Sequence, residues 1–204
     1  MQIRPPELQN FLDTIQKALS VRVLGQPARK MLSKTFSALR EVGVVVSREG
    51  THLPVCRHLS KACNPSDFSS PDLVAISRSF TALESSLIWR QRAGPIVGAS
   101  EGFQYGHANA VIVGPEGLEE RSDVSIGVSL LAPNIRYPDH THPPEETYLV
   151  MSNGAFSNAS TPWTEPGIGG TFHNAPGVVH KMRSGDVPLM AFWVLWNGGK
   201  ATGL

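Results

Sequence analysis

The stretch Tyr137-Pro-Asp-His-Thr-His-Pro-Pro-Glu-Glu-Thr-Tyr148 carries two histidines, two glutamates and two tyrosines around a Pro-Pro pair. His140 and His142 are two residues apart, so on extended backbone their side chains point to the same side. The Pro-Pro pair interrupts strand pairing and turns the chain. Glu146 and Tyr148 then share one face of the strand that follows. The stretch therefore predicts a β-rich fold in which two imidazoles and a carboxylate converge on one interior point.

Imidazole nitrogen and carboxylate oxygen together make a mixed ligand set that suits Zn, Fe, Mn, Co or Ni. A late histidine, His180, closes the turn-then-strand segment Gly170-Thr-Phe-His-Asn-Ala-Pro-Gly-Val-Val-His180 and is placed to complete the set from across a barrel. An isolated His-x-His pair is more often a surface pair or a hydrogen-bonded core pair. The glutamate four residues after His142, the intervening turn and the distant His180 favour a metal site here.

The part of the chain around this stretch has the pattern of short strands separated by clusters of Gly, Pro and Asn. It holds 14 of the 19 glycines and five of the seven histidines. Many short antiparallel strands in about 100 residues are typical of a sandwich or a small barrel. The expected strands are 103–113, 124–132, 146–151, 170–173, 177–183 and 188–196.

The part of the chain before this region has the spacing of amphipathic helices. Apolar residues recur every three or four positions over 8–19, 31–39 and 73–87. In front of the last of these, Ser70 can cap the helix and Pro71 can open it. Each helix needs a partner for its apolar face, and together they could cover a sheet. We therefore predict two regions, a helical one over 1–98 that packs on the barrel and the barrel itself, with the metal site, over 99–204.

The overall composition excludes several classes of protein. The chain has 204 residues, of which 41% are hydrophobic and 17% charged, so it is long enough to bury a core and is not disordered. The 18 basic and 17 acidic residues give a net charge of +1, which argues against a dedicated surface for nucleic acid or for acidic lipids. Residues 1–98 carry 13 basic and 7 acidic residues, and residues 99–204 carry 5 and 10. This shift in charge coincides with the change from helical to strand patterns.

No run of residues approaches the roughly 18 apolar residues of a membrane span. The N-terminal sequence MQIRPPELQNFLDTIQKAL lacks the apolar centre of a signal peptide. The two cysteines, Cys56 and Cys63, are fewer than a small secreted scaffold would carry. We expect a cytoplasmic protein with neither membrane nor nucleic acid as a partner. The sequence leaves open whether it is a monomer or a homodimer.

The motifs resemble those of the cupin superfamily. The segment 140–146 fits the first cupin motif, Gly-x5-His-x-His-x3,4-Glu-x6-Gly, although Asn134 stands in place of the leading glycine. The segment 170–180 fits the second motif, with His180 one residue early. The resemblance covers about residues 103–196. It implies a mainly β fold, in which an α-helical N-terminal region precedes a C-terminal cupin barrel of the double-stranded β-helix or jelly-roll type.

A narrower resemblance is to the bacterial cupin dimethylsulfoniopropionate lyases. It rests on the stretch from Tyr137 to Tyr148, on a later His-Lys-Met, and on the helical half in front of the barrel. It implies that Tyr148 is the catalytic base and that Tyr137 and His140 are polar residues of the pocket. The first histidine of the cupin motif is often a ligand, so His140 is also a candidate ligand. The metal ligands implied by the resemblance are His142, Glu146 and His180.

The activity implied by this resemblance is a β-elimination that gives dimethyl sulfide and acrylate. The base removes a proton next to the substrate carboxylate, while one divalent metal ion offsets the charge of that carboxylate. A tyrosine titrates near 10, and a nearby cation would lower its pKa enough for Tyr148 to serve. Without the resemblance, Tyr148 would more often be an interior tyrosine with a hydrogen-bonded hydroxyl.

Two other functions compete with the lyase. One is a different metal-dependent cupin enzyme, such as an Fe(II) dioxygenase or an isomerase that acts on a small acid. The other is a non-catalytic cupin that binds a ligand. A regulator of that kind would be expected to carry a DNA-binding module, and the N-terminal helices lack an obvious recognition-helix pattern.

The substrate of the lyase reaction is a small sulfonium carboxylate. Its positive sulfur can be attracted to the face of an aromatic ring. Trp193 and Trp196 have opposite parity on one expected strand, so at most one of them points inward if the strand is regular. We expect Tyr137, His140 and Trp193 to contact the substrate, and the other aromatic candidates are Trp163 and Trp196.

Overall fold

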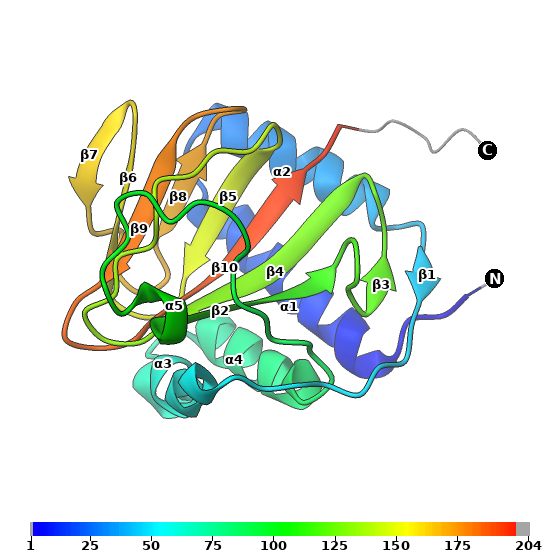
Figure 1. Cartoon of the computed structure of the whole chain (residues 1–204). Helices are drawn as coiled ribbons and strands as arrows, with labels where there is room; N and C mark the ends of the chain where they lie inside the picture. The colour runs from blue at the N-terminus through cyan, green and yellow to red at the C-terminus, as the bar shows by residue number, and fades with distance from the viewer. Residues whose placement is uncertain (1, 199–204) are drawn as a thin grey trace.

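A seven-stranded sheet separates two buried layers of side chains in the computed structural model, which describes residues 2–198. The strands lie in the order β1-β3-β2-β4-β10-β5-β8 (Figure 1). Strand β10 pairs antiparallel with β4 on one side and β5 on the other. The strands are β1 (Val44–Val45), β2 (His107–Val113), β3 (Glu119–Glu120), β4 (Val124–Leu131), β5 (Glu145–Val150), β8 (Thr171–Asn174) and β10 (Leu189–Trp196).

A second sheet of three strands packs over the inner face of the first and closes the barrel. It consists of β7 (Thr161–Thr164), β6 (Gly154–Asn158) and β9 (His180–Ser184), in that order. Phe156 and Met182 of this sheet share one buried cluster with Tyr148 and Val150 of the larger sheet. The fold is therefore a small β-barrel with its own core, as the sequence predicts.

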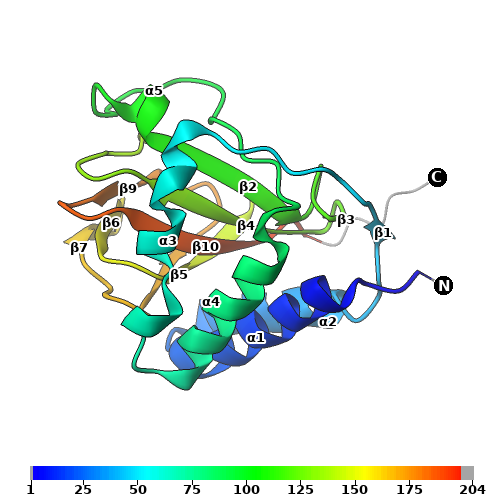
Figure 2. The ribbon, with the colours of Figure 1, turned by 90° about the horizontal axis from the view of Figure 1, so that it is seen from below.

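Three amphipathic helices cover the outer face of the large sheet, and Figure 2 shows them from below. They are α1 (Pro6–Arg22), α2 (Gln26–Ala38) and α4 (Pro71–Glu84), each with a proline in its first turn. Phe11 of α1, Phe80 of α4 and Phe192 of β10 contact one another, and the ring centroid of Phe192 lies 5.2 Å from that of Phe11 and 5.1 Å from that of Phe80. These helices confirm the predicted helical character of the N-terminal part of the chain. None of the helices within residues 2–198 is long and apolar enough to cross a bilayer.

Short helical turns connect α2 to α4 and lead into β2. They are η1 (Pro54–His58), α3 (Leu59–Ala62), η2 (Pro65–Asp67) and α5 (Phe103–Gly106). The predicted strand 103–113 is therefore wrong in its first four residues, which form α5. Gly106 packs so closely on Ile135 that an added Cβ would lie 2.5 Å from the isoleucine Cδ1 atom, a tertiary constraint that strand spacing does not reveal.

Two further strand predictions need correction. The sequence does not predict the hairpin of β6 and β7, because residues 152–164 are rich in Ser, Asn and Thr and lack an alternating apolar pattern. The predicted strand 177–183 begins only at His180. The residues before it form a turn, in which Gly177 has a φ of +70° and Val178 donates to the carbonyl of Ala175.

A buried ion-pair network around Glu119 ties the segment before α1 to the edge of the sheet. Arg4 contacts both carboxylate oxygens, with Nη2 3.0 Å from Oε1, and Gly43 donates its amide to Oε1 at 2.8 Å. Arg121 lies 3.3 Å from the same oxygen. Burial opposes ionisation of Glu119, but the bonds from Arg4 and Gly43 hold its pKa below the ordinary value. The carboxylate is therefore charged and fully paired in the folded protein.

We expect the substitution Glu119→Gln to lower the free energy of unfolding by about 3 kcal/mol, because it leaves the buried Arg4 without its counter-charge. Urea titration measures the change. The control is Glu120→Gln, which removes an exposed ion pair with Arg48 and should cost less than about 1 kcal/mol. Equal losses for the two variants would contradict this interpretation.

The stabilisation that the Arg4–Glu119 ion pair contributes should depend on pH. The pKa of Glu119 is lower in the folded chain, so its stabilisation is fully present above the ordinary value of 4.5 and is lost as the pH falls through the folded value. The difference in free energy of unfolding between wild type and Glu119→Gln should therefore shrink as the pH falls below the ordinary value of 4.5.

Candidate metal centre

Three histidines from two segments meet inside the barrel. His140 and His142 lie in the connection between β4 and β5, and His180 is the first residue of β9. One ligand atom from each of the three lies within 4.8 Å of the others. The backbones of His140 and His180 are joined by two hydrogen bonds of 3.1 and 2.9 Å. This bridge brings together the two motifs that the sequence separates by about 40 residues.

The Nδ1 atom of each imidazole lies at hydrogen-bond distance from a backbone carbonyl only two residues away. The partners are Pro138 for His140 at 3.0 Å, Pro144 for His142 at 2.9 Å and Val178 for His180 at 3.0 Å. A carbonyl oxygen only accepts, so each Nδ1 carries the proton and each Nε2 keeps its lone pair. Histidines that ligate metal ions are oriented by backbone carbonyls in this way.

The Nε2 atoms of His142 and His180 are buried, and within residues 2–198 they have no hydrogen-bond partner. They lie 3.5 and 3.1 Å from Oε2 of Glu146. A buried polar atom without a partner costs about 1–3 kcal/mol. Nε2 atoms and a carboxylate facing one another satisfy this need when they share a divalent ion, and the donor types fit Zn, Fe, Mn, Co or Ni. The residues present therefore suit a metal ion.

Glu146 is buried at the start of β5, and its Oε2 accepts a hydrogen bond of 3.0 Å from Nδ2 of Asn174 on β8. Burial opposes its negative charge, but the imidazoles of His142 and His180 outweigh that effect and lower the pKa of Glu146 to about 2. The carboxylate is consequently ionised at neutral pH, as a metal ligand must be.

The histidines respond differently to the same surroundings. Burial, followed by the nearby His180, lowers the pKa of His140 to about 4, so its imidazole is neutral at pH 7. Burial also works against protonation of His142, but the Glu146 carboxylate outweighs it and raises the pKa of His142. Without a bound cation, the single negative charge of Glu146 is thus balanced by attracting a proton to the cluster. A divalent cation would compete with that proton.

Tyr148 stands next to this cluster on the inner face of β5. It pairs in register with Trp193 on one side and Phe172 on the other, and its ring centroid lies 6.5 Å from that of His180. Burial, and then the neighbouring Glu146 carboxylate, raise the pKa of Tyr148 well above its usual value. In the protein alone its phenol is therefore protonated.

Tyr137 lies beside His140, with its ring centroid 5.0 Å from that of the imidazole. Its hydroxyl oxygen accepts a hydrogen bond of 3.1 Å from Nδ2 of Asn109, whose Oδ1 in turn accepts one of 2.6 Å from Ser129. Burial raises the pKa of Tyr137 to about 12. Because Asn109 donates to its oxygen, the hydroxyl proton of Tyr137 is free to be donated into the barrel.

The tryptophans separate as strand parity predicts. Trp193 packs against the barrel cluster, and Trp196 packs against the helix-side core. The Trp193 ring packs against Gly127, where an added Cβ would come within 2.2 Å of it, so only glycine leaves room for this ring. Trp163 lies outside the barrel, with the guanidinium of Arg183 4.4 Å from its ring centre.

The structure brings together all seven residues that the sequence proposed for the site: Tyr137, His140, His142, Glu146, Tyr148, His180 and Trp193. Sequence reasoning missed Asn109, Ser129 and Asn174. Each of these polar residues lies on an inward-facing position of a strand other than that of Tyr148 or His180, so only the pairing of the strands relates it to the site. His107 is also buried: its ring stacks on that of Phe103, with the centroids 3.7 Å apart, and its Nε2 accepts a hydrogen bond from the amide of Arg92.

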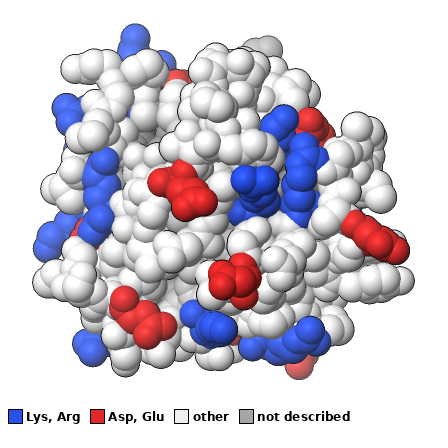
Figure 3. Space-filling view, turned by 90° about the vertical axis from the view of Figure 1, so that its left-hand side faces the viewer, with Lys and Arg blue, Asp and Glu red and all other residues white. Residues whose placement is uncertain are grey.

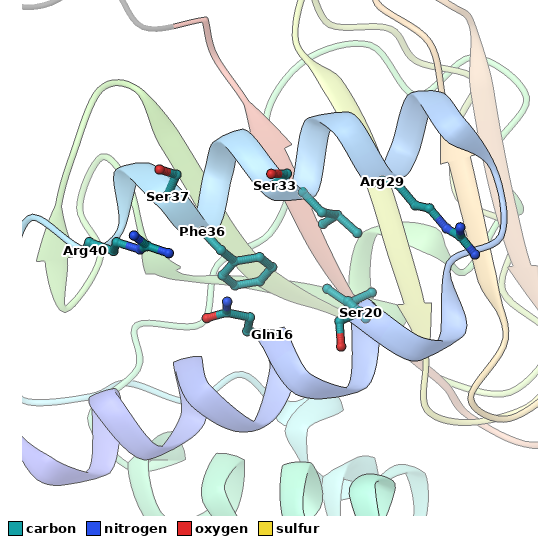
Figure 4. Close-up of a pocket in the computed structure, with 9 residues that line it drawn as sticks. Gln16, Ser20, Arg29, Ser33, Phe36, Ser37 and Arg40 are labelled. Carbon is teal, nitrogen blue, oxygen red and sulfur yellow. The ribbon is translucent and has the colours of Figure 1, made fainter.

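One concave surface outside the barrel, between α1 and α2, lacks these functional groups. A cavity of about 400 Å³ between α1 and α2 is lined by serines, arginines and apolar residues, without a histidine, carboxylate or tyrosine (Figure 4). It lies on the helical side of the sheet, away from the barrel interior. Figure 3 shows acidic and basic side chains interspersed on the side of the molecule that carries β7 and β9.

A profile of the dimethylsulfoniopropionate lyase family matches residues 28–191, which include most of α2, all of α4 and the barrel as far as the first residues of β10. This chain belongs to that family. The match covers part of the predicted helical region as well as the metal motifs, and a barrel behind an N-terminal helical region is the fold class that the sequence motifs implied.

Individual members of the family support this assignment. The chain is 26% identical over 174 residues to the putative dimethylsulfoniopropionate lyase DddL of Cereibacter sphaeroides, covering 84% of this chain and 72% of DddL. It is 30% identical over 141 residues to the dimethylsulfoniopropionate lyase DddQ of Ruegeria pomeroyi, covering 66% and 69%. The crystal structure of the lyase DddQ from Ruegeria pomeroyi DSS-3 superposes with a TM-score of 0.68 at 22% identity, covering 98% and 95%.

We expect His140→Ala, His142→Ala and His180→Ala each to weaken binding of a divalent metal ion at least about 10-fold, because each removes an Nε2 donor. Competition with a chromophoric chelator measures the dissociation constant. His173→Ala is the control, since His173 bonds to Thr147 and lies near Glu145 instead of the cluster. Unchanged affinity for His140→Ala alone would make His140 a pocket residue and not a ligand.

Proposed function

We propose that this chain cleaves dimethylsulfoniopropionate to dimethyl sulfide and acrylate inside the barrel. The observation that carries the proposal is the position of Tyr148, a buried phenol two residues after Glu146 and beside the histidine cluster, in a chain that belongs to the lyase family. A base and a cation-binding cluster on one strand face are the two parts that this β-elimination needs.

The difficult step of the reaction is removal of a proton from the carbon next to the substrate carboxylate. That proton is weakly acidic, because the carboxylate already carries a negative charge. We propose that His140, His142, Glu146 and His180 hold one divalent ion. When bound there, such an ion stabilises the negative charge that develops on the substrate carboxylate and lowers the pKa of a nearby phenol.

Tyr148 takes the role of the base in this proposal. Its phenolate oxygen accepts the α-proton, the C–H electron pair forms the carbon–carbon double bond, and the carbon–sulfur bond breaks with its electron pair on sulfur. Burial and the Glu146 carboxylate keep Tyr148 protonated in the protein alone. The proposal therefore makes the base conditional on positive charge that offsets Glu146, so an empty site would also be an inactive one.

Tyr137 and Trp193 are proposed to position the substrate. The hydroxyl proton of Tyr137, left free by Asn109, can be donated to a substrate carboxylate. The partly exposed ring of Trp193 lies next to Tyr148 in register and can face the sulfonium, where cation–π attraction contributes about 0.5–2 kcal/mol. Tyr137 belongs to the buried cluster that contains Tyr148, and Trp193 packs against that cluster, so both side chains can contact a substrate held beside Tyr148.

The substitution Tyr148→Phe should lower turnover at least about 100-fold, because it removes the base and keeps the ring. Gas chromatography of headspace dimethyl sulfide measures turnover, and metal analysis should show unchanged metal content. The control is Tyr105→Phe, since Tyr105 is 78% exposed. Near-normal activity of the Tyr148→Phe variant would rule out Tyr148 as the base.

Elimination consumes no dioxygen, so we expect equal release of dimethyl sulfide under nitrogen and in air, with acrylate formed in equal amount. Removal of the metal by a chelator should abolish the release, and a divalent ion added back should restore it. A requirement for dioxygen would instead favour a cupin dioxygenase, and metal binding without any turnover would favour a ligand-binding cupin.

A further inference from the structure

We propose that Asn158 and Asn174 form a directed hydrogen-bond chain that positions the Glu146 carboxylate for metal binding. The inference rests on the proposed metal site and names two positioning residues outside its ligand set. Nδ2 of Asn158 donates to Oδ1 of Asn174 at 3.0 Å, and Nδ2 of Asn174 donates to Oε2 of Glu146 at 3.0 Å.

The direction of the chain is set by backbone groups whose roles are unambiguous. The amide N–H of Ser160 donates to Oδ1 of Asn158 at 3.0 Å, so this atom must be the oxygen of the side-chain amide. Nδ2 of Asn158 lies 3.2 Å from the carbonyl of His173, which only accepts. Asn158 therefore donates from its NH2 group to Asn174, which accepts with its side-chain oxygen. The NH2 group of Asn174 then points toward Glu146.

Burial makes this arrangement costly to replace. Asn174 is 1% exposed and Glu146 3%, so water has little access to the bond between them. One carboxylate oxygen is engaged by a neutral donor, which fixes the rotation of the carboxylate without adding a charge to the cluster. Partners of this kind set the orientation of metal ligands, and their loss typically weakens metal affinity about 10- to 100-fold.

The chain also crosses the junction between the two sheets. Asn174 pairs in register with Glu146 across β8 and β5, and Asn158 pairs in register with His180 across β6 and β9. The residue opposite one proposed ligand thus bonds to the residue opposite another. The contacts that join the two sheets at this point therefore also orient the Glu146 carboxylate.

The first test is metal affinity of Asn174→Leu and Asn174→Asp, measured by chelator competition with Zn²⁺ and with Mn²⁺. Asn174→Leu removes the donor at similar volume, and Asn174→Asp adds a second carboxylate against Glu146. We expect the dissociation constant to rise at least about 10-fold in both. The matched control is Thr147→Val, which removes a 3.0 Å bond to His173 between the same two strands, and its affinity should stay at the wild-type value.

The second test inverts the chain without touching Asn174 or Glu146. Asn158→Asp keeps an oxygen for the Ser160 amide but loses the NH2 group, so Asn174 must turn its own NH2 group outward and its oxygen toward Glu146. Asn158 is only partly buried, which favours folding of the variant. We expect Asn158→Asp to lose as much metal affinity as Asn174→Leu. Asn158→Ala should lose less.

The outcomes separate this inference from the proposed function. If the wild type binds neither ion, the proposed metal site fails and the inference fails with it. If the wild type binds and the Asn174 and Asn158 variants bind equally well, the positioning chain is wrong and the metal site stands. If Thr147→Val loses as much metal affinity as Asn174→Leu, weaker pairing of β5 with β8 would explain both losses. That result would overturn the inference.

Discussion

Three imidazoles and one carboxylate are held together in a barrel interior that offers them little else to bond with. Each imidazole donates a hydrogen bond from its Nδ1 to a carbonyl two residues away. The buried Nε2 atoms of His142 and His180 lack a hydrogen-bond partner within residues 2–198. This unsatisfied set constrains the rest of the structure, because both sheets contribute to it. A charged, shared ligand is the simplest way to satisfy it.

The helical layer serves the site indirectly. The helices bury the outer face of the large sheet, and the Arg4–Glu119 network fixes the segment before α1 to strand β3, next to the edge strand β1. The inner face of the same sheet is then free to carry polar residues such as Asn109, Ser129 and Glu146 toward the barrel interior. The cost of burying these groups is met by hydrogen bonds that run in fixed directions.

Electrostatics inside the barrel depend on whether a cation is present. Glu146 pulls a proton toward His142 and pushes the pKa of Tyr148 upward, so the protein by itself stabilises the resting form of the phenol. A cation shared by the ligands would reverse both influences. Under the proposed mechanism, the carboxylate that helps to hold the cation is also the group that keeps the base inactive without it.

The sequence by itself determined the local parts of this protein. Helical spacing located α1, α2 and α4, and the spacing of His140, His142, Glu146 and Tyr148 placed them on common faces, because these relations span only a few residues. Only the tertiary structure decided that His180 meets His140 across a backbone bridge, that Trp193 and not Trp196 faces inward, and that Asn158 and Asn174 reach Glu146. These contacts depend on strand register and on the closing of one sheet over the other, and a single sequence does not encode long-range pairing in any local pattern.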